Sequence, residues 1–171
     1  MPKPANTNYP GFFQRYISQV QEDDLKIAFK NQMPAAEIFL QSINEELSCK
    51  KYAEDKWTIK EVLQHMIDAE RIFTYRALCF ARKDQNTLPS FDENGYAVNS
   101  NAGDRDWGNL ISEFVAVRKS TEFLYNSFND ETLNSEGKAS DYVISISALG
   151  FVIIGHVNHH IRIIQERYIG V

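Results

Sequence analysis

Apolar residues recur at every third or fourth position along nearly the whole chain, and this helical period limits the fold more than any other feature. The pattern predicts four amphipathic helices, over about 25–47, 58–82, 107–128 and 145–168. Strand signals are nearly absent, and only the run 142–146 is ambiguous between helix and strand. We therefore predict an all-α four-helix bundle that forms one domain, 1–171, with 1–20 as an N-terminal lead segment.

The second helix has the clearest start. Thr58 and Glu61 stand three residues apart and predict a capping box, in which each side chain satisfies a free backbone amide of the other. Within the first helix, Pro34 is expected to cause a kink, because proline lacks the N–H that the preceding turn needs. The second helix is thus the best defined of the four.

The connection from Lys83 to Asp106 joins the second and third helices and is unusually long. Neighbouring antiparallel helices need only a few residues between them. A connection of this length predicts a crossover that makes the second and third helices parallel. The expected order of the bundle is therefore up-down-down-up.

All four histidines fall on two of the predicted helices, and this clustering is the sharpest functional signal. His65 lies on the inner side of the second helix, while His156 and His160 lie one turn apart in the apolar stripe of the fourth. His159 lies toward the edge of that stripe. For a single histidine, a core residue satisfied by hydrogen bonds is the simpler interpretation. This interpretation is weaker for three histidines, because each buried imidazole without a hydrogen-bond partner costs about 1–3 kcal/mol.

A metal ion would resolve this cost if the three histidines meet. With a rise of about 1.5 Å per residue, His65 lies roughly 10 Å from the start of its helix, and His160 and His156 lie roughly 12 and 18 Å from the end of theirs. Antiparallel packing therefore brings them nearly level. Three nitrogen ligands leave an open position, which is typical of a reactive rather than a structural site. Zinc, nickel, iron and manganese all remain open, and Val157 stands where a zinc protease has its glutamate.

Weaker candidates for a role at the site are acidic, aromatic, amide or basic residues: Asp68, Glu70, Phe91, Asp92, Glu93, Asn94, Tyr96, Arg118 and Arg162. For the two acids near His65 a solvated helix face is the simpler interpretation. The aromatic and polar residues of the crossover could cover the mouth of the site or form an ordinary loop. The two arginines could bind an anionic substrate group, although most such arginines lie on the surface.

Charge and cysteine content narrow the class of protein. The chain has 18 Lys and Arg against 23 Asp and Glu, with no basic patch, so we expect no nucleic-acid partner. Cys49 and Cys79 form no C-x-x-C pair, which argues against a disulfide framework and fits a reducing compartment. The segment 142–161 has no charged residue, but it contains polar residues and histidines and is best interpreted as a buried helix. Without a signal peptide at 1–6, we expect a cytoplasmic protein with no membrane partner.

Four segments carry a resemblance to a known family: Lys56–His65, Asp68–Ile72, Phe91–Asn94 and Gly155–His160. With these motifs the chain resembles the DinB-like (DinB/YfiT-like) family of four-helix-bundle metalloproteins. The resemblance extends from about Tyr9 onward and implies a divalent metal held by His65, His156 and His160. Characterised relatives include transferases and isomerases in which the metal activates a low-molecular-weight thiol. No motif identifies a general base or a thiol-binding residue here.

The sequence and the resemblance together favour a metal-dependent enzyme, a thiol S-transferase that acts on electrophilic small molecules. A metal-dependent hydrolase and a non-catalytic metal-binding stress protein are the alternatives. The expected cofactors are a divalent ion (Zn, Ni, Fe or Mn) and a low-molecular-weight thiol. The expected partners are a small-molecule substrate and a second copy of the chain in a homodimer.

Overall fold

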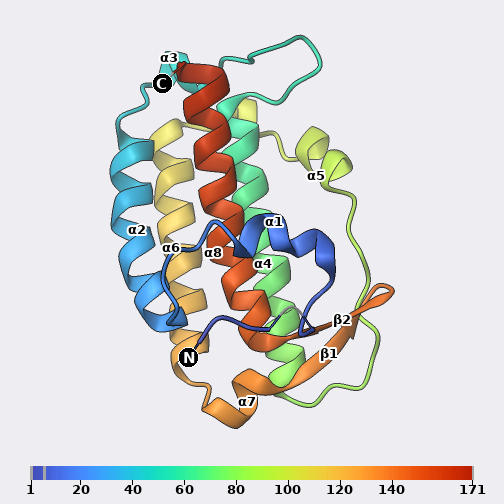
Figure 1. Ribbon diagram of the computed structural model, residues 1–171. Coiled ribbons are helices and arrows are strands. Elements are labelled where there is room, and N and C mark those ends of the chain that lie inside the picture. Colours follow the sequence, from blue (N-terminus) through green and yellow to red (C-terminus); the bar gives the residue numbers. More distant parts are fainter. Residues whose placement is uncertain (1, 6, 171) are drawn as a thin grey trace.

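The computed structural model describes residues 2–5 and 7–170, and within them four long helices lie side by side (Figure 1). These are α2 (Leu25–Gln41), α4 (Ile59–Ala81), α6 (Trp107–Asn126) and α8 (Ile146–Ile163). The shorter elements are η1 (Gly11–Phe13), α1 (Gln14–Ile17), α3 (Glu45–Ser48), α5 (Glu93–Asn99), η2 (Ala102–Asp104), α7 (Asp130–Asn134), β1 (Glu136–Ala139), β2 (Tyr142–Ser145) and η3 (Ile164–Ile169). The predicted helical bundle is confirmed, with a small β-hairpin added at one end.

The long helices begin at side chains that cap them. In the predicted capping box, the Glu61 N–H donates to Thr58 Oγ1 (3.1 Å) and the Thr58 N–H donates to the Glu61 carboxylate (2.6 Å). Asp106 accepts from the Asn109 N–H at the start of α6, and Ser145 caps α8. Because each cap occupies a donor that the first turn leaves free, local sequence fixes where these helices start.

The predicted first helix is interrupted. α2 ends at Gln41 and α3 begins at Glu45, so the expected single helix over 25–47 is wrong in its last turns. Asn44 accepts from the Leu47 N–H (2.8 Å) and starts a new helical turn, as an N-cap residue does. The helix α2 continues through Pro34 without ending there.

A hairpin stands where few strand signals were found. β1 pairs antiparallel with β2, with Glu136 opposite Ser145, so the ambiguous run 142–146 is mainly strand. The connection between α4 and α6 is fastened to this hairpin, because the Leu88 N–H donates to the Lys138 carbonyl (3.0 Å) and the Ser140 N–H donates to the Leu88 carbonyl (2.7 Å). The crossover thus contacts the end of the bundle at which α4 finishes.

Contacts between the long helices give their relative directions. Between α4 and α6, Glu70 contacts Arg118 and, one turn on, Thr74 contacts Thr121, so these two helices point the same way. Between α4 and the C-terminal end of the chain, Tyr168 Oη donates to the Trp57 carbonyl (2.7 Å), so α8 runs opposite to α4. Among the described residues, no helix has both the length and the apolar character needed to cross a bilayer.

Helix α1 lies directly on α8, and Gly155 makes this approach possible. A Cβ atom at Gly155 would stand 2.1 Å from the Tyr16 carbonyl oxygen, which belongs to the backbone and cannot rotate away. We expect Gly155→Ala to lower the free energy of unfolding by about 1–3 kcal/mol, because α1 must move off α8. Urea unfolding followed by circular dichroism measures this change.

The matched control is Gly103→Ala, because nothing lies within 4 Å of a Cβ built at Gly103. The free energy of unfolding of this control should stay within about 0.5 kcal/mol of that of the original chain, as is usual for surface substitutions. Equal stability of the two variants would show that α1 does not pack on α8 in this way.

Candidate metal centre

The three histidines that the sequence singles out converge between α4 and α8. His65 Nε2 lies 3.1 Å from His156 Nε2, which in turn lies 3.1 Å from His160 Nε2. The three ligand atoms all lie within 4.8 Å of one another. His65 and His156 are buried and His160 is half-buried. The antiparallel course of α4 and α8 therefore brings the predicted residues to one point.

His159 is separate from this cluster, as its place on the helix predicts. Its side chain is half-buried, and Nδ1 lies 3.3 Å from Gln19 Nε2. Its ring packs against Tyr16 at a centroid distance of 5.4 Å. His159 thus contributes to the contact between α1 and α8 and makes a natural control for the other three histidines.

The geometry of the cluster fits a bound cation better than hydrogen bonding alone. A neutral imidazole nitrogen offers either one N–H or one lone pair. Because His156 Nε2 faces two other Nε2 atoms at 3.1 Å, it cannot form a well-directed hydrogen bond with both. An ion bound by three nitrogens at about 2.0–2.1 Å in tetrahedral geometry would hold them roughly 3.3 Å apart, close to the two separations here. Within the described residues, no carboxylate or thiol joins the cluster.

Burial keeps the three imidazoles neutral. It lowers the pKa of His65 from 6.5 to about 4. Burial, followed by the nearby histidines, also lowers the pKa of His156 and of His160 well below 6.5. A metal ligand must present a free lone pair, so the site holds its histidines in the ligating form at neutral pH.

These shifts predict how the metal-free protein responds to pH. Because the folded pKa of His65 is below the unfolded value, the unfolded chain binds more protons, and stability that is present above pH 6.5 is lost as the pH falls toward 4. The loss from His65 alone is on the order of 3 kcal/mol. Urea unfolding of chelator-treated protein from pH 7.5 to 4.5 measures it. His65→Gln should make the curve less steep, because His156 and His160 still contribute to it. A flat curve for the original chain would contradict the burial of the site.

Aromatic rings surround the cluster. The Trp57 ring lies 5.0 Å from that of His65, and the rings of Tyr16 and Phe73 lie 5.2 Å and 6.1 Å from that of His156. Apolar walls lower the local dielectric and exclude water, which strengthens electrostatic interactions within the site. The lead segment, through α1, is therefore part of the site.

Two cavities open onto the cluster. The first, of about 200 Å³, is bordered by His65 and His156, and the second, of about 220 Å³, by His160. Phe91 and Glu93 line the first and Asn94 lines the second, so the crossover borders both openings, as one sequence interpretation suggested. Asp92 and Tyr96 instead line a separate hollow that contains Asp68.

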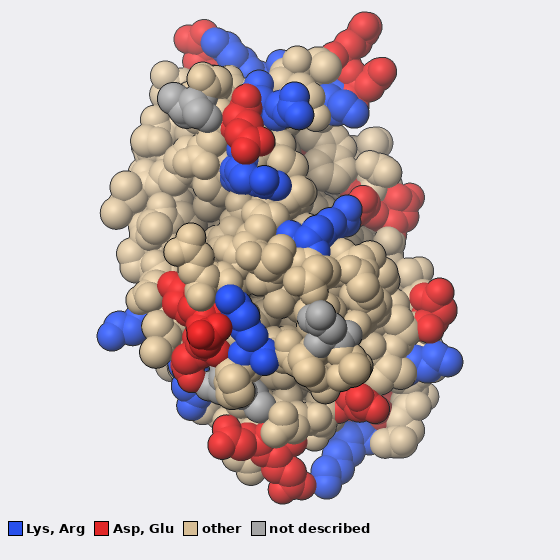
Figure 2. All heavy atoms as spheres, viewed as in Figure 1, with Lys and Arg blue, Asp and Glu red and all other residues tan. Residues whose placement is uncertain are grey.

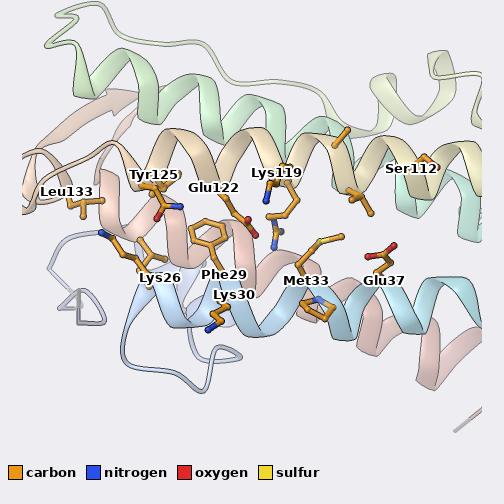
Figure 3. Close-up of a pocket in the computed structure, with 16 residues that line it drawn as sticks. Lys26, Phe29, Lys30, Met33, Glu37, Ser112, Lys119, Glu122, Tyr125 and Leu133 are labelled. Carbon is orange, nitrogen blue, oxygen red and sulfur yellow. The ribbon is translucent and has the colours of Figure 1, made fainter.

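The largest of the cavities described lies elsewhere, between α2 and α6 (Figure 3). It has a volume of about 790 Å³, and Phe29 and Met33 contribute to its apolar wall. None of the histidines lines it. The size of a cavity does not by itself indicate a reaction, so the histidine cluster and its smaller cavities remain the candidate site.

Two of the weaker candidates differ from expectation. Glu70 is not on a solvated face but is 2% exposed, and its carboxylate accepts from Arg118 at 2.8 and 2.9 Å. Arg118 is fully buried and also donates to Gln32, so it is a core residue whose charge is already paired. Arg162 is exposed and lines neither cavity at the histidines.

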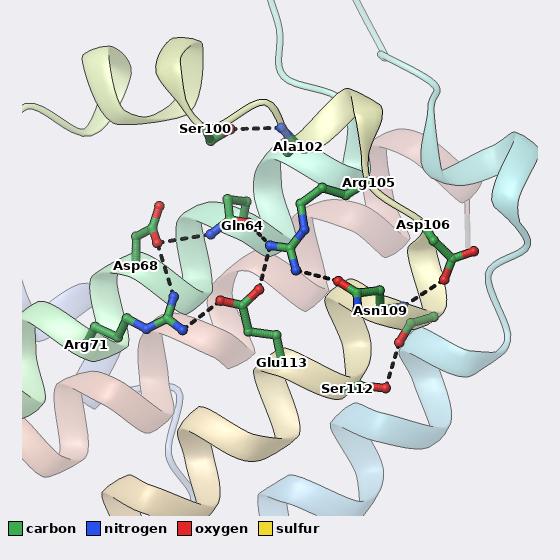
Figure 4. A network of polar contacts seen from close by, with 11 residues as sticks. Gln64, Asp68, Arg71, Ser100, Ala102, Arg105, Asp106, Asn109, Ser112 and Glu113 are labelled. Carbon is green, nitrogen blue, oxygen red and sulfur yellow. Dashed lines mark hydrogen bonds and ion pairs between the residues drawn. The ribbon is translucent and has the colours of Figure 1, made fainter.

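Asp68 belongs to a polar network between α4 and α6 (Figure 4). It accepts from Gln64 (3.0 Å), while Arg71 and Arg105 both contact Glu113, at 2.6 and 2.5 Å. Burial raises the pKa of Asp68. Because Arg105 lies at the end of the crossover, the network fastens that segment to the two helices.

On the face shown in Figure 2, acidic and basic side chains are interspersed.

Sequence reasoning missed Arg76, which lines the cavity at His65 and His156. The spacing of residues along α4 could have identified it. Ala69, Phe73 and Arg76 follow His65 by four, eight and eleven residues, so all four lie on one face of the helix. The same helical period that identified the histidines therefore also marks this arginine.

The fold and the buried histidine cluster define a helical-bundle protein with the donor set of a metal site. The sequence matches the DinB superfamily over residues 28–164, and the chain belongs to this superfamily. This confirms the family that the motifs indicated.

A solved structure gives the same fold. The chain is similar to YfiT from Bacillus subtilis, described as a probable metal-dependent hydrolase with an unusual four-helix bundle topology. The match has a TM-score of 0.73 at 15% identity and covers 96% of this chain and 90% of that one. No curated protein matches the sequence.

Proposed function

We propose that the chain is a metal-dependent enzyme that binds one divalent ion through His65, His156 and His160. The observation that carries the proposal is the convergence of three neutral imidazoles in which, among the described residues, no further protein ligand takes part. Such a site leaves a coordination position open for a reactant. A divalent ion bound there would supply Lewis-acid chemistry and lower the pKa of a coordinated water or thiol.

The residues around the cluster would support this chemistry. The buried rings of Tyr16 and Phe73 exclude bulk water, and the depressed pKa values leave the three histidines unprotonated and able to bind an ion at neutral pH. We also propose the up-down-down-up order for the bundle. The parallel contacts between α4 and α6 and the antiparallel contact of α4 with the end of the chain support it.

Hydrolysis of a small molecule, with water as the nucleophile, is the reaction that we favour. The first cavity, of about 200 Å³, suits a small substrate, because pockets that hold drug-sized ligands measure roughly 300–1,000 Å³. The description of YfiT as a probable metal-dependent hydrolase points the same way. Thiol S-transfer is the second candidate. The observation in its favour is the second cavity beside His160, which offers a separate approach for a second reactant.

One experiment separates these functions. Protein purified without an affinity tag is loaded in turn with Zn, Ni, Mn and Fe and offered small esters, amides and lactones without thiol. It is then offered electrophiles together with cysteine, glutathione or bacillithiol. Product formation without thiol identifies the hydrolase, and substrate-dependent loss of thiol identifies the transferase.

Inactivity in both screens at full metal loading would favour a non-catalytic metal-binding protein. The matched controls are His160→Ala, which should abolish any activity found, and His159→Ala, which should retain it. Activity that persists in His160→Ala would show that the reaction does not use the cluster.

A further inference from the structure

We propose that Arg76 binds the carboxylate of a small apolar acid in the cavity beside His65 and His156, and so sets the substrate class. This inference rests on the proposed function, because it places the reacting end of that acid toward the histidines. It is carried by the burial of Arg76, its hydrogen bonds and the composition of the cavity.

Among the described residues, three basic side chains other than histidines are buried, and they differ in whether an acidic side chain pairs with them. They are Lys60, Arg76 and Arg118, which are 3%, 3% and 0% exposed. Lys60 forms an ion pair with Glu45, and Arg118 forms one with Glu70. For Arg76, no carboxylate of the described residues lies within ion-pair distance. Arginine stays charged in proteins, and an unpaired buried charge is costly, so a ligand anion is the natural counter-ion.

The hydrogen bonds of Arg76 orient its guanidinium without neutralising it. Nη1 donates to Tyr142 Oη (3.0 Å) and Nη2 donates to the Pro89 carbonyl (2.7 Å). The Phe73 ring lies 5.9 Å from the guanidinium carbon. These acceptors are neutral, and they use two of the five N–H donors of the group. The remaining donors suit a planar carboxylate, which arginine binds through parallel hydrogen bonds.

The cavity has one charged end and apolar walls. Arg76 stands eleven residues after His65 on the same face of α4, and helical side chains lean toward the N-terminus, which here is toward His65. Phe13, Phe73 and Phe91 line the same cavity. A ligand of matching shape has a carboxylate at one end, an apolar body and its reacting group at the end near the histidines.

Two other charged groups line the same cavity. Arg15 is exposed and donates from Nη2 to Tyr16 Oη (2.7 Å), so it adds positive charge at the mouth. Glu93 is also exposed, and its carboxylate forms no ion pair with Arg76. Because exposed charges are screened by water, the buried Arg76 dominates the inner end of the cavity.

The test compares an acid with its neutral analogue. 4-Phenylbutyrate and 4-phenylbutyramide are titrated into chelator-treated protein and into Zn-loaded protein by isothermal titration calorimetry. We expect the acid to bind both forms, and the amide to bind at least about tenfold more weakly, as loss of a charged hydrogen bond implies. Arg76→Gln should remove this preference. The control Arg82→Gln, at an exposed position at the end of α4, should retain it.

A second measurement does not depend on a variant. In the original chain, the acid should shift the Arg76 Nε–H resonance in 15N-resolved spectra and the amide should not. Arg76→Lys, which keeps the charge without the planar donors, should bind the acid with intermediate affinity.

The outcomes separate the two proposals. Acid binding that appears only with Zn and is unchanged in Arg76→Gln would mean that the carboxylate binds the metal, and it would overturn the inference. Equal binding of acid and amide, or no binding and no shift, would also overturn it. Arg76-dependent acid binding in protein that fails to bind any metal would uphold the anion site and contradict the proposed function.

Discussion

His65→Ala, His156→Ala and His160→Ala are each expected to lose the divalent ion that the original chain binds with a stoichiometry of about one. The three Nε2 atoms share one centre, so the loss of any one of them leaves only two ligands, either both on α8 or one on each of α4 and α8. We expect the affinity for Zn to fall by more than the roughly 10- to 100-fold that loss of an outer-sphere partner costs. Elemental analysis and competition with a chromophoric chelator measure stoichiometry and affinity.

The control is His159→Ala, which removes an imidazole from the same helix but not from the cluster. It should bind metal as the original chain does. If His159→Ala lost the metal while His156→Ala kept it, the assignment of ligands on α8 would be wrong.

The second large effect is expected at the ion pair between Glu70 and Arg118. Arg118→Met should lower the free energy of unfolding by about 3–5 kcal/mol, because it leaves the Glu70 carboxylate buried without its cation. It also removes the donor to Gln32, which links the pair to α2. Urea unfolding at pH 7 measures the change.

Two companion variants sharpen this test. The double variant Glu70→Leu/Arg118→Met should recover most of the lost stability, because an apolar pair leaves no unpaired charge in the core. Lys50→Met removes one side of the exposed pair with Glu46 and should cost less than about 1 kcal/mol. An Arg118→Met variant as stable as Lys50→Met would show that the pair is not buried in solution.

Local chemistry explains why much of the fold and site could be predicted from sequence. The capping box at Thr58 and Glu61 acts within one turn, so its residues identify it wherever they occur. The placement of His156 and His160 on one inward face follows from the helical period, which tertiary packing does not change. The position of His65 along the bundle, level with His156 and His160, followed from the rise per residue once α4 and α8 were taken as antiparallel.

The features that sequence did not predict depend on long-range partners. β1 has the sequence Glu-Gly-Lys-Ala, which lacks strand alternation, and it forms because β2 pairs with it and Ala139 is buried. Glu70 and Arg118 are 48 residues apart, and nothing local marks either of them as buried. A charged residue in a helical pattern is ordinarily solvated, so its partner must be known before its burial can be inferred.

The most direct test of the central claim is anomalous diffraction from crystals of tag-free, metal-loaded protein, recorded above and below the absorption edge of the bound metal. We predict one anomalous peak between α4 and α8, at about 2.0–2.1 Å from Nε2 of His65, His156 and His160 when the ion is Zn. A fully loaded crystal with its peak at any other group of residues, or with no peak between these three imidazoles, would contradict it.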